Sequence, residues 1–185
     1  MKQKGEGLTL WFTGLSASEK STLAGGGGVA NDLLERGCRV EILDGDQIRK
    51  VLSAGLGFTK ADRHTNIRRL AFVSRLLSRN GVVAIVAAIS PCREVREEVR
   101  LQEMPGRFVE VFVDAPLSTL VKRDPKGLYA KAMRGELENF TGVSNPYEPP
   151  ERSEIKVRTD QQAVQESVAS VLDWLEASGY VGNRS

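Results

Sequence analysis

A glycine, a lysine and two hydroxyl residues lie close together near the start of the chain. The segment Gly14-Leu15-Ser16-Ala17-Ser18-Glu19-Lys20-Ser21-Thr22 keeps the first glycine, the lysine and the hydroxyls of the pattern G-x-x-x-x-G-K-[ST]. In such a loop, backbone N–H groups surround the phosphates, an ammonium neutralises charge and a hydroxyl binds Mg²⁺. The segment therefore predicts a phosphate site formed by Gly14, Ser16, Lys20, Ser21 and Thr22, although an ordinary strand-to-helix turn is the alternative.

Two residues of this loop depart from the pattern. Glu19 replaces the second glycine, and Ala17 stands where backbone must also approach the phosphates. Glycine serves such positions because φ is often positive there, and a Cβ then costs about 1 kcal/mol or more. We expect both residues to strain the loop and Glu19 to repel phosphate. The four glycines Gly25–Gly28 follow, and we expect them to weaken the first turns of the next helix.

Two carboxylates flank a glycine farther along, at Asp44-Gly45-Asp46, directly after a short apolar run. A carboxylate at that point can hold Mg²⁺ or accept a proton from a hydroxyl group. Asp46 is the predicted catalytic carboxylate and, with Ser21, the predicted metal ligand. A solvated Asx turn is the alternative, because Asp-Gly is a common turn signal.

The elements that position these residues follow one repeating pattern. Five short β-type runs alternate with segments of helical period: Leu8–Thr13, Val40–Leu43, Val82–Ala88, Phe108–Val113 and Ile155–Arg158. One helical stripe is Ile67, Leu70, Ala71, Ser74 and Leu77, and another is Val164, Val168, Val171, Leu172 and Leu175. This alternation predicts an α/β fold with a five-stranded parallel sheet, helices on both faces and functional residues at the carboxyl ends of the strands.

Residues 135–152 break that pattern, because glycines and prolines interrupt both helix and strand there. We interpret this segment as a lid, with a long surface loop as the alternative.

The length and composition of the chain are those of an ordinary globular domain. The 185 residues predict one domain, 1–185, and a net charge of +2 argues against a nucleic-acid-binding module. Two isolated cysteines favour a reducing, cytoplasmic location, and we find no targeting or membrane-spanning segment.

Several motifs together resemble the adenylylsulfate kinase family. They are Gly14-Leu15-Ser16 with Lys20-Ser21-Thr22, Asp44-Gly45-Asp46 with Arg49, Leu56-Gly57-Phe58, Arg63 with Asn66-Ile67-Arg68-Arg69, Ile89-Ser90-Pro91, Arg123-Asp124-Pro125-Lys126-Gly127-Leu128-Tyr129, Phe140-Thr141-Gly142 and Pro146-Tyr147-Glu148-Pro149. The resemblance runs in order from about Leu8 to Asp160. It implies a three-layer P-loop kinase fold that uses ATP and Mg²⁺ to phosphorylate the 3′-hydroxyl of adenosine 5′-phosphosulfate.

The resemblance also implies roles for individual residues. Arg123 covers the ATP adenine, and Asp46, Lys20 and Ser90 are catalytic. The sulfated nucleotide is bound by Asp44, Arg49, Phe58, Arg63, Asn66, Ile89, Ser90, Lys126 and Phe140. Phe58 and Phe140 are similar to a pair that stacks on the substrate adenine, with a core role as the alternative. Arg123 and Lys126 could instead be solvated basic residues.

Two choices stay open at this stage. Ser90 forms either a phosphoserine intermediate or a substrate contact, and the contact is simpler because direct transfer needs only positioning and electrostatics. The second choice concerns activity, since the substrate side is nearly complete while the ATP side is altered. The alternative function is a non-catalytic domain that binds adenosine 5′-phosphosulfate. A homodimer is compatible with either function.

Overall fold

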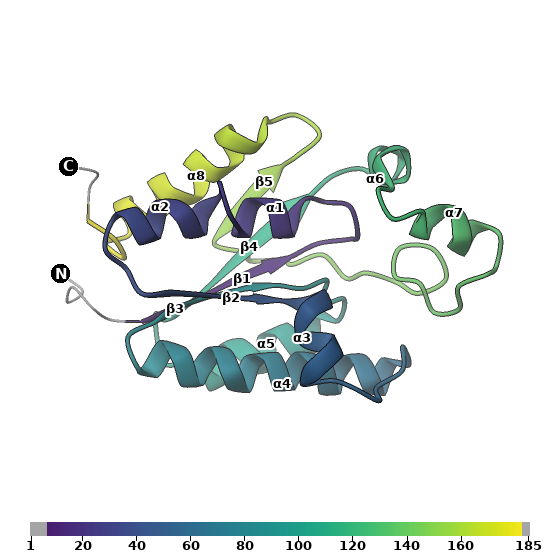
Figure 1. Cartoon of the computed structure of the whole chain (residues 1–185), viewed down its shortest axis with the longest axis horizontal. Coiled ribbons are helices and arrows are strands. Elements are labelled where there is room, and N and C mark those ends of the chain that lie inside the picture. The colour runs from purple at the N-terminus through teal and green to yellow at the C-terminus, as the bar shows by residue number, and fades with distance from the viewer. Residues whose placement is uncertain (1–6, 183–185) are drawn as a thin grey trace.

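A five-stranded parallel sheet forms the centre of the molecule in the computed structural model, which describes residues 7–182 (Figure 1). The strands are β1 (Leu8–Thr13), β2 (Val40–Asp44), β3 (Val83–Ala87), β4 (Phe108–Asp114) and β5 (Ile155–Arg158), in the spatial order β2-β3-β1-β4-β5. Every pairing is parallel. The predicted five-stranded parallel sheet is therefore confirmed.

Helices cover both faces of this sheet, as predicted. In Figure 1, one face carries α1 (Lys20–Ala24), α2 (Val29–Glu35) and α8 (Val164–Ala177), and the other carries α3 (Gly45–Val51), α4 (Lys60–Arg79) and α5 (Arg93–Gln102). Two further helices, α6 (Leu117–Arg123) and α7 (Leu128–Met133), extend beyond the carboxyl ends of the strands with the lid segment.

Strand β1 supplies both hydrophobic cores because successive side chains point to opposite faces. Leu8, Leu10 and Phe12 pack with the layer of α1, α2 and α8, whereas Trp11 packs with α4 and α5. All six residues of the strand are buried. A central strand buried on both faces explains the continuous apolar run from which it was predicted.

The four glycines do not lie inside a helix, which corrects our expectation of a weakened helix start. Helix α1 ends at Ala24, the glycines form a turn, and α2 begins at Val29. Gly27 has a φ of 83°, and a Cβ on Gly28 would lie 2.2 Å from the carbonyl oxygen of Leu23. The glycines thus let the chain change direction against α1, so their helix penalty does not apply.

Residues 135–152 form neither helix nor strand, apart from one isolated bridge between Thr141 and Asn145. The far end of the segment is attached to the loop after β3, since the amide of Glu148 donates to the carbonyl of Pro91 at 2.9 Å. The irregular lid segment expected from its glycines and prolines is present. Its movement on ligand binding stays a prediction.

Candidate active site

The phosphate loop connects β1 to α1 and contains three unusual backbone conformations. A Cβ on Gly14 would lie 2.3 Å from the carbonyl oxygen of Val113, so only glycine fits there. Ala17 and Glu19 have φ values of 60° and 74°, in the left-handed region that disfavours side chains. The predicted conformational strain at Ala17 and Glu19 is thus confirmed.

Lys20 lies over this loop with its ammonium buried. Its Nζ donates to the carbonyl of Leu15 at 2.7 Å and to Ser18 Oγ at 3.3 Å. Burial lowers the pKa of Lys20 to about 8, although the carboxylates of Asp46 and Asp44 raise it. Asp46 and Asp44 therefore offset the burial of the Lys20 ammonium only in part. A buried ammonium in this position can donate hydrogen bonds to phosphate oxygens.

Glu19 is directed toward the residue predicted to cover the ATP adenine. Its Oε1 lies 3.6 Å from Arg123 Nη1, and Arg123 also donates to Thr159 Oγ1 at 2.9 Å. The structure therefore brings Arg123 next to the phosphate loop. Ser16 contributes its carbonyl, which accepts a bond of 3.0 Å from the Tyr129 hydroxyl, and Thr22 is exposed on α1.

The carboxylates after β2 face this loop. Ser21 Oγ donates to Asp44 Oδ2 at 2.6 Å, while Asp44 Oδ1 accepts the amides of Asp46 and Gln47 and so caps α3. Asp46 is exposed and forms an ion pair with Lys126. The expectation that Ser21 and Asp46 bind a metal ion stays a prediction. In the structure, Asp44 contacts Ser21 and Asp46 faces Lys126.

Arg49, Phe58 and Arg63 gather on the α3–α4 side of the crevice. The Arg49 guanidinium lies 4.3 Å from the centroid of the exposed Phe58 ring, and Arg63 Nε donates to the carbonyl of Phe58 at 2.9 Å. Arg63 also bonds Thr141 Oγ1 and the carbonyl of Asn139, both in the lid segment. Burial and the nearby Arg49 lower the pKa of Arg63. Two neighbouring guanidinium groups have the charge and geometry that can bind an anionic ligand.

Asn66 and Phe140, two further residues predicted to bind substrate, have different surroundings. Asn66 is 7% exposed, and its buried Oδ1 has no hydrogen-bond partner in the structure. A buried amide oxygen without a donor indicates a position where a ligand or water can bind. Phe140 is half-buried and packs edge-on against Tyr129, with centroids 5.1 Å apart. Phe140 therefore packs its ring against α7 although it belongs to the lid segment.

The loop after β3 holds Ile89 and Ser90. Ser90 has a φ of 48° and is 2% exposed, and its Oγ accepts a bond of 3.0 Å from the Trp11 indole N–H. The carbonyl of Ile89 accepts a bond of 2.7 Å from Thr13 Oγ1. The Ser90 hydroxyl is therefore enclosed in protein rather than presented to the crevice.

The comparisons with known proteins agree with this geometry. The family model described as "Adenylylsulphate kinase" matches residues 6–158. The chain belongs to the adenylylsulfate kinase family. A Picosynechococcus adenylyl-sulfate kinase is 51% identical over 175 residues, covering 95% of this chain and 97% of the relative. A Deinococcus deserti adenylyl-sulfate kinase is 54% identical over 171 residues, covering 92% of both chains.

A solved structure extends the likeness to three dimensions. The Mycobacterium tuberculosis APS kinase CysC, in complex with AMPPNP and APS, superposes with a TM-score of 0.86 and 44% identity. The match covers 92% of this chain and 98% of that one. The P-loop kinase fold and the assignment of this chain to the adenylylsulfate kinases thus rest on sequence and structure together.

The sequence analysis did not predict two contacts behind the crevice of this kinase, Arg96–Glu110 and Tyr147–Thr13. Arg96 donates to Glu110 Oε1 at 2.8 Å, and the Tyr147 hydroxyl lies 2.9 Å from Thr13 Oγ1. One signal was available, because Glu110 interrupts the otherwise apolar run Phe108–Val113. A charge buried there must find a partner, and that requirement predicts a buried ion pair.

The described residues 7–182 also bear on metal binding and membrane insertion. No group of three or more His, Cys, Asp or Glu side chains is arranged to hold a metal ion by itself. Within the same residues, no helix is both long and apolar enough to cross a membrane. Ser21 and Asp44 supply two neighbouring oxygen atoms, of the kind that Mg²⁺ prefers as ligands.

Proposed function

We propose that this kinase transfers the γ-phosphoryl group of ATP to the 3′-hydroxyl of adenosine 5′-phosphosulfate. The observation that carries the proposal is the position of the Asp44–Asp46 pair. Asp44 bonds Ser21 of the phosphate loop, and Asp46 pairs with Lys126 across the crevice. We infer that the carboxylates act between the triphosphate of ATP and a substrate anion bound by Arg49 and Arg63. The named relatives support the same reaction.

On the ATP side, the residues fit a Mg²⁺ ion bound with the nucleotide. Ser21 and Asp44 offer the oxygen ligands that Mg²⁺ prefers, and the triphosphate would supply others. When bound, Mg²⁺ would neutralise charge on the phosphates. Lys20 adds a second positive charge at the same loop. We propose Asp44 rather than Asp46 as the carboxylate beside Ser21, which revises the metal ligands expected from sequence.

The transfer step follows from these positions. The 3′-oxygen of the substrate forms a bond to the γ-phosphorus while the bond to the ADP oxygen breaks. Asp46 accepts the hydroxyl proton, and the ion pair with Lys126 holds that carboxylate in place. Interaction with Asp46 raises the pKa of Lys126, so the ammonium persists at neutral pH.

On the other side, Arg49 and Arg63 are suited to the phosphate and sulfate groups of adenosine 5′-phosphosulfate. The exposed ring of Phe58 offers a stacking surface once Arg49 turns from it toward the anion. Phe140 is proposed as the facing ring. The unpartnered Oδ1 of Asn66 is available to a donor on the ligand. Together these groups match a nucleotide that carries two anionic groups.

Ser90 is better explained as part of a substrate contact than as a phosphorylated intermediate. Its Oγ accepts from Trp11, donates to the carbonyl of Ala88 at 3.4 Å and is almost fully buried. A nucleophile must reach the γ-phosphorus, and these contacts hold the hydroxyl away from it. We therefore propose that Ile89 and Ser90 position the substrate through their backbone.

A second function has one specific observation in its favour. Ala17 and Glu19 both hold left-handed backbone conformations with a side chain attached, which weakens the ATP side alone. A chain with such a loop could bind adenosine 5′-phosphosulfate without efficient turnover. This alternative predicts sulfated-nucleotide binding with little ADP release.

One experiment separates the two functions. ADP release is followed with ATP and adenosine 5′-phosphosulfate, and calorimetry measures the binding of each ligand alone. We expect turnover that Asp46→Asn lowers by about 100- to 10,000-fold, the usual contribution of a positioned base. Sulfated-nucleotide binding without ADP release would overturn catalysis. Failure to bind that nucleotide would overturn both functions.

Two further points remain proposals. We propose a cytoplasmic location, because both cysteines are free thiols in the structure and the expected co-substrate is ATP. We also propose a homodimer, which sedimentation velocity would test. A hexameric APS kinase from Thiobacillus denitrificans is 35% identical, although this chain covers 30% of that protein.

A further inference from the structure

Arg96 of α5 is a fully buried cation behind the crevice, with an exposed fraction of 1%. Its Nε donates to Glu110 Oε1 at 2.8 Å, and the two side chains are 1% and 3% exposed. Burying such a pair removes both charges from water, so the pair by itself adds little to stability. Its presence therefore calls for an explanation beyond packing.

The Nη1 and Nη2 groups of Arg96 provide this explanation, because they bond two separate segments of the chain. Arg96 Nη1 donates to the carbonyl of Ser90 at 2.5 Å, and Nη2 donates to the carbonyl of Glu148 at 2.7 Å. These carbonyls belong to two different segments, the loop after β3 and the root of the lid. The planar fork of arginine can reach both while it remains paired with Glu110.

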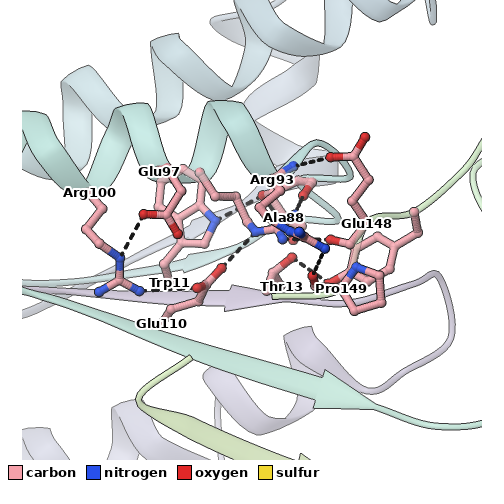
Figure 2. Close-up of polar contacts among 12 residues, drawn as sticks. Trp11, Thr13, Ala88, Arg93, Glu97, Arg100, Glu110, Glu148 and Pro149 are labelled. Carbon is pink, nitrogen blue, oxygen red and sulfur yellow. Dashed lines mark hydrogen bonds and ion pairs between the residues drawn. The ribbon is translucent and has the colours of Figure 1, made fainter. Parts of the chain in front are cut away.

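Neighbouring contacts connect the same two segments. The amide of Arg93 donates to Glu148 Oε2 at 2.7 Å, as Figure 2 shows, and Arg93 Nη2 donates to the carbonyl of Pro149 at 3.1 Å. The Arg96 guanidinium also lies 5.7 Å from the centroid of the Tyr147 ring. The amino-terminal half of α5 thus holds the root of the lid.

The backbone carbonyls of the loop after β3 accept hydrogen bonds from residues outside the loop. Three consecutive carbonyls, those of Ile89, Ser90 and Pro91, accept bonds from Thr13 Oγ1, Arg96 and the amide of Glu148. Ser90 has a left-handed φ of 48°, which persists only where surroundings fix it. Arg96 is the charged member of this set of donors.

We propose that Arg96 is a positioning residue that couples the Ile89-Ser90-Pro91 loop to the root of the lid and so controls the affinity for the sulfated nucleotide. It touches no substrate and acts through the backbone of Ser90 and Glu148. The effect on binding rests on the proposed function. The effect on the lid root does not.

Arg100 provides a matched control on the same helix. It also donates to Glu110, at 3.2 Å, and it pairs with Glu154, but within residues 7–182 its hydrogen bonds and ion pairs reach neither Ser90 nor Glu148. Arg96→Met and Arg100→Met each remove one cation from Glu110, whereas only the first releases the two carbonyls. Arg96→Lys keeps the charge without the fork.

Calorimetry with adenosine 5′-phosphosulfate and with Mg-ATP, together with thermal melting, tests the proposal. Arg96→Met should weaken sulfated-nucleotide binding roughly 10- to 100-fold, the scale of lost charged hydrogen bonds, and leave Mg-ATP binding within about twofold. Arg96→Lys should recover melting temperature more than affinity. Equal affinity losses in Arg96→Met and Arg100→Met would overturn the proposal.

Hydrogen exchange in the absence of ligand provides a second measurement that does not depend on the proposed function. The amide of Glu148 should exchange faster in Arg96→Lys than in the parent chain or in Arg100→Lys. Unchanged exchange there would overturn the coupling, even if affinity falls. Should Arg96→Met fail to fold, Arg96→Lys carries both measurements. A parent chain that binds no sulfated nucleotide would contradict the proposed function, while the exchange result would still decide the role of Arg96.

Discussion

The phosphate loop and the Ile89-Ser90-Pro91 loop both contain residues with a side chain and a positive φ, but they hold them differently. Ser90 is fixed by Trp11 on its hydroxyl and by Arg96 on its carbonyl. Glu19 has an ion pair with Arg123 at 3.6 Å, and its side chain is 30% exposed. An unfavourable backbone conformation survives where surrounding contacts fix it. The substrate loop meets that condition more fully than the phosphate loop.

Restoring glycine to the phosphate loop should have the largest effect on this difference. The double variant Ala17→Gly with Glu19→Gly should tighten ATP binding by about 10- to 1,000-fold, because it removes two strained Cβ atoms and one charge that opposes phosphate. Calorimetric titration of the parent, both single variants and the double variant forms a cycle, and coupling is expected within one loop.

Glu19→Ala is the control for this series, because it removes the carboxylate but keeps the Cβ. Arg123 lies close enough to offset part of the charge. The alanine variant should therefore recover less affinity than the glycine variant. If the parent binds Mg-ATP as tightly as the double variant, the altered loop is harmless and the non-catalytic alternative loses its support.

Arg63→Ala tests the substrate side. Sulfated-nucleotide binding should weaken by roughly 1.5 to 3 kcal/mol, the scale of a charged hydrogen bond. Arg63 also bonds Asn139 and Thr141 of the lid segment, so the loss should include part of the lid contact. Isothermal titration gives the affinity, and Arg69→Ala, on the same helix, is the comparison. Unchanged affinity would exclude Arg63 from the site.

The glycine turn after α1 tests how the phosphate loop is supported. Gly28→Ala should lower the free energy of unfolding by about 1 to 3 kcal/mol, because its Cβ would meet the Leu23 carbonyl at 2.2 Å. Gly26→Ala meets nothing within 4 Å and should be neutral or raise stability by about 0.4 to 1 kcal/mol. Urea denaturation compares the two variants. Equal effects would contradict the account of this turn.

Hydrogen exchange over residues 135–152 tests the lid itself. Ligands should protect the amides of its first part most, because the amide of Glu148 already donates to Pro91 without ligand. Both nucleotides together should give the greatest protection, as expected for a lid that closes over them. Equal exchange with and without ligands would count against closure.

The smallest effect is expected at Glu103. Its buried carboxyl group is bonded by hydroxyl groups, whereas the buried carboxylate of Glu110 is paired with Arg96. Glu103 accepts bonds from Thr9 Oγ1 at 2.9 Å and Ser78 Oγ at 3.3 Å, and burial raises its pKa above the ordinary 4.5. The folded state therefore binds the proton more tightly than the unfolded state, so this carboxyl destabilises the fold increasingly as pH rises through its folded pKa.

Glu103→Gln should accordingly raise the melting temperature at pH 7, with a difference that disappears as the pH falls below 4.5, where both states are protonated. Thermal melts of both proteins across this range measure the difference. A constant difference at all pH values would show that titration of Glu103 is not its cause.

The sequence could predict what depends on local pattern. The run Leu8–Thr13 is apolar on both faces because β1 supplies two cores, so strand and burial follow from composition alone. The conformations of Ala17 and Glu19 followed from the backbone that a phosphate loop requires. The break at Gly25–Gly28 was missed, because a glycine run weakens a helix and permits a turn equally well.

Contacts between distant segments could not be predicted in the same way. Arg96 joins Glu110 of β4 to Ser90 and Glu148, and no local periodicity records that arrangement. The pairing of Asp44 with Ser21 instead of Asp46 depends on how α3 is capped. The remaining roles of the site residues need ligand-binding measurements.

The central position of β1 also bears on how the chain is made. This strand pairs with β3 and β4, so that Leu10 lies beside Ile85 and Val109. At about 5 to 20 residues per second, a ribosome needs about 4 to 15 seconds to pass from β1 to its first partner strand. During that interval a strand with four large apolar side chains, Leu8, Leu10, Trp11 and Phe12, is without its neighbours. The order of this sheet therefore leaves the apolar side chains of β1 exposed on the nascent chain until β3 has been synthesised.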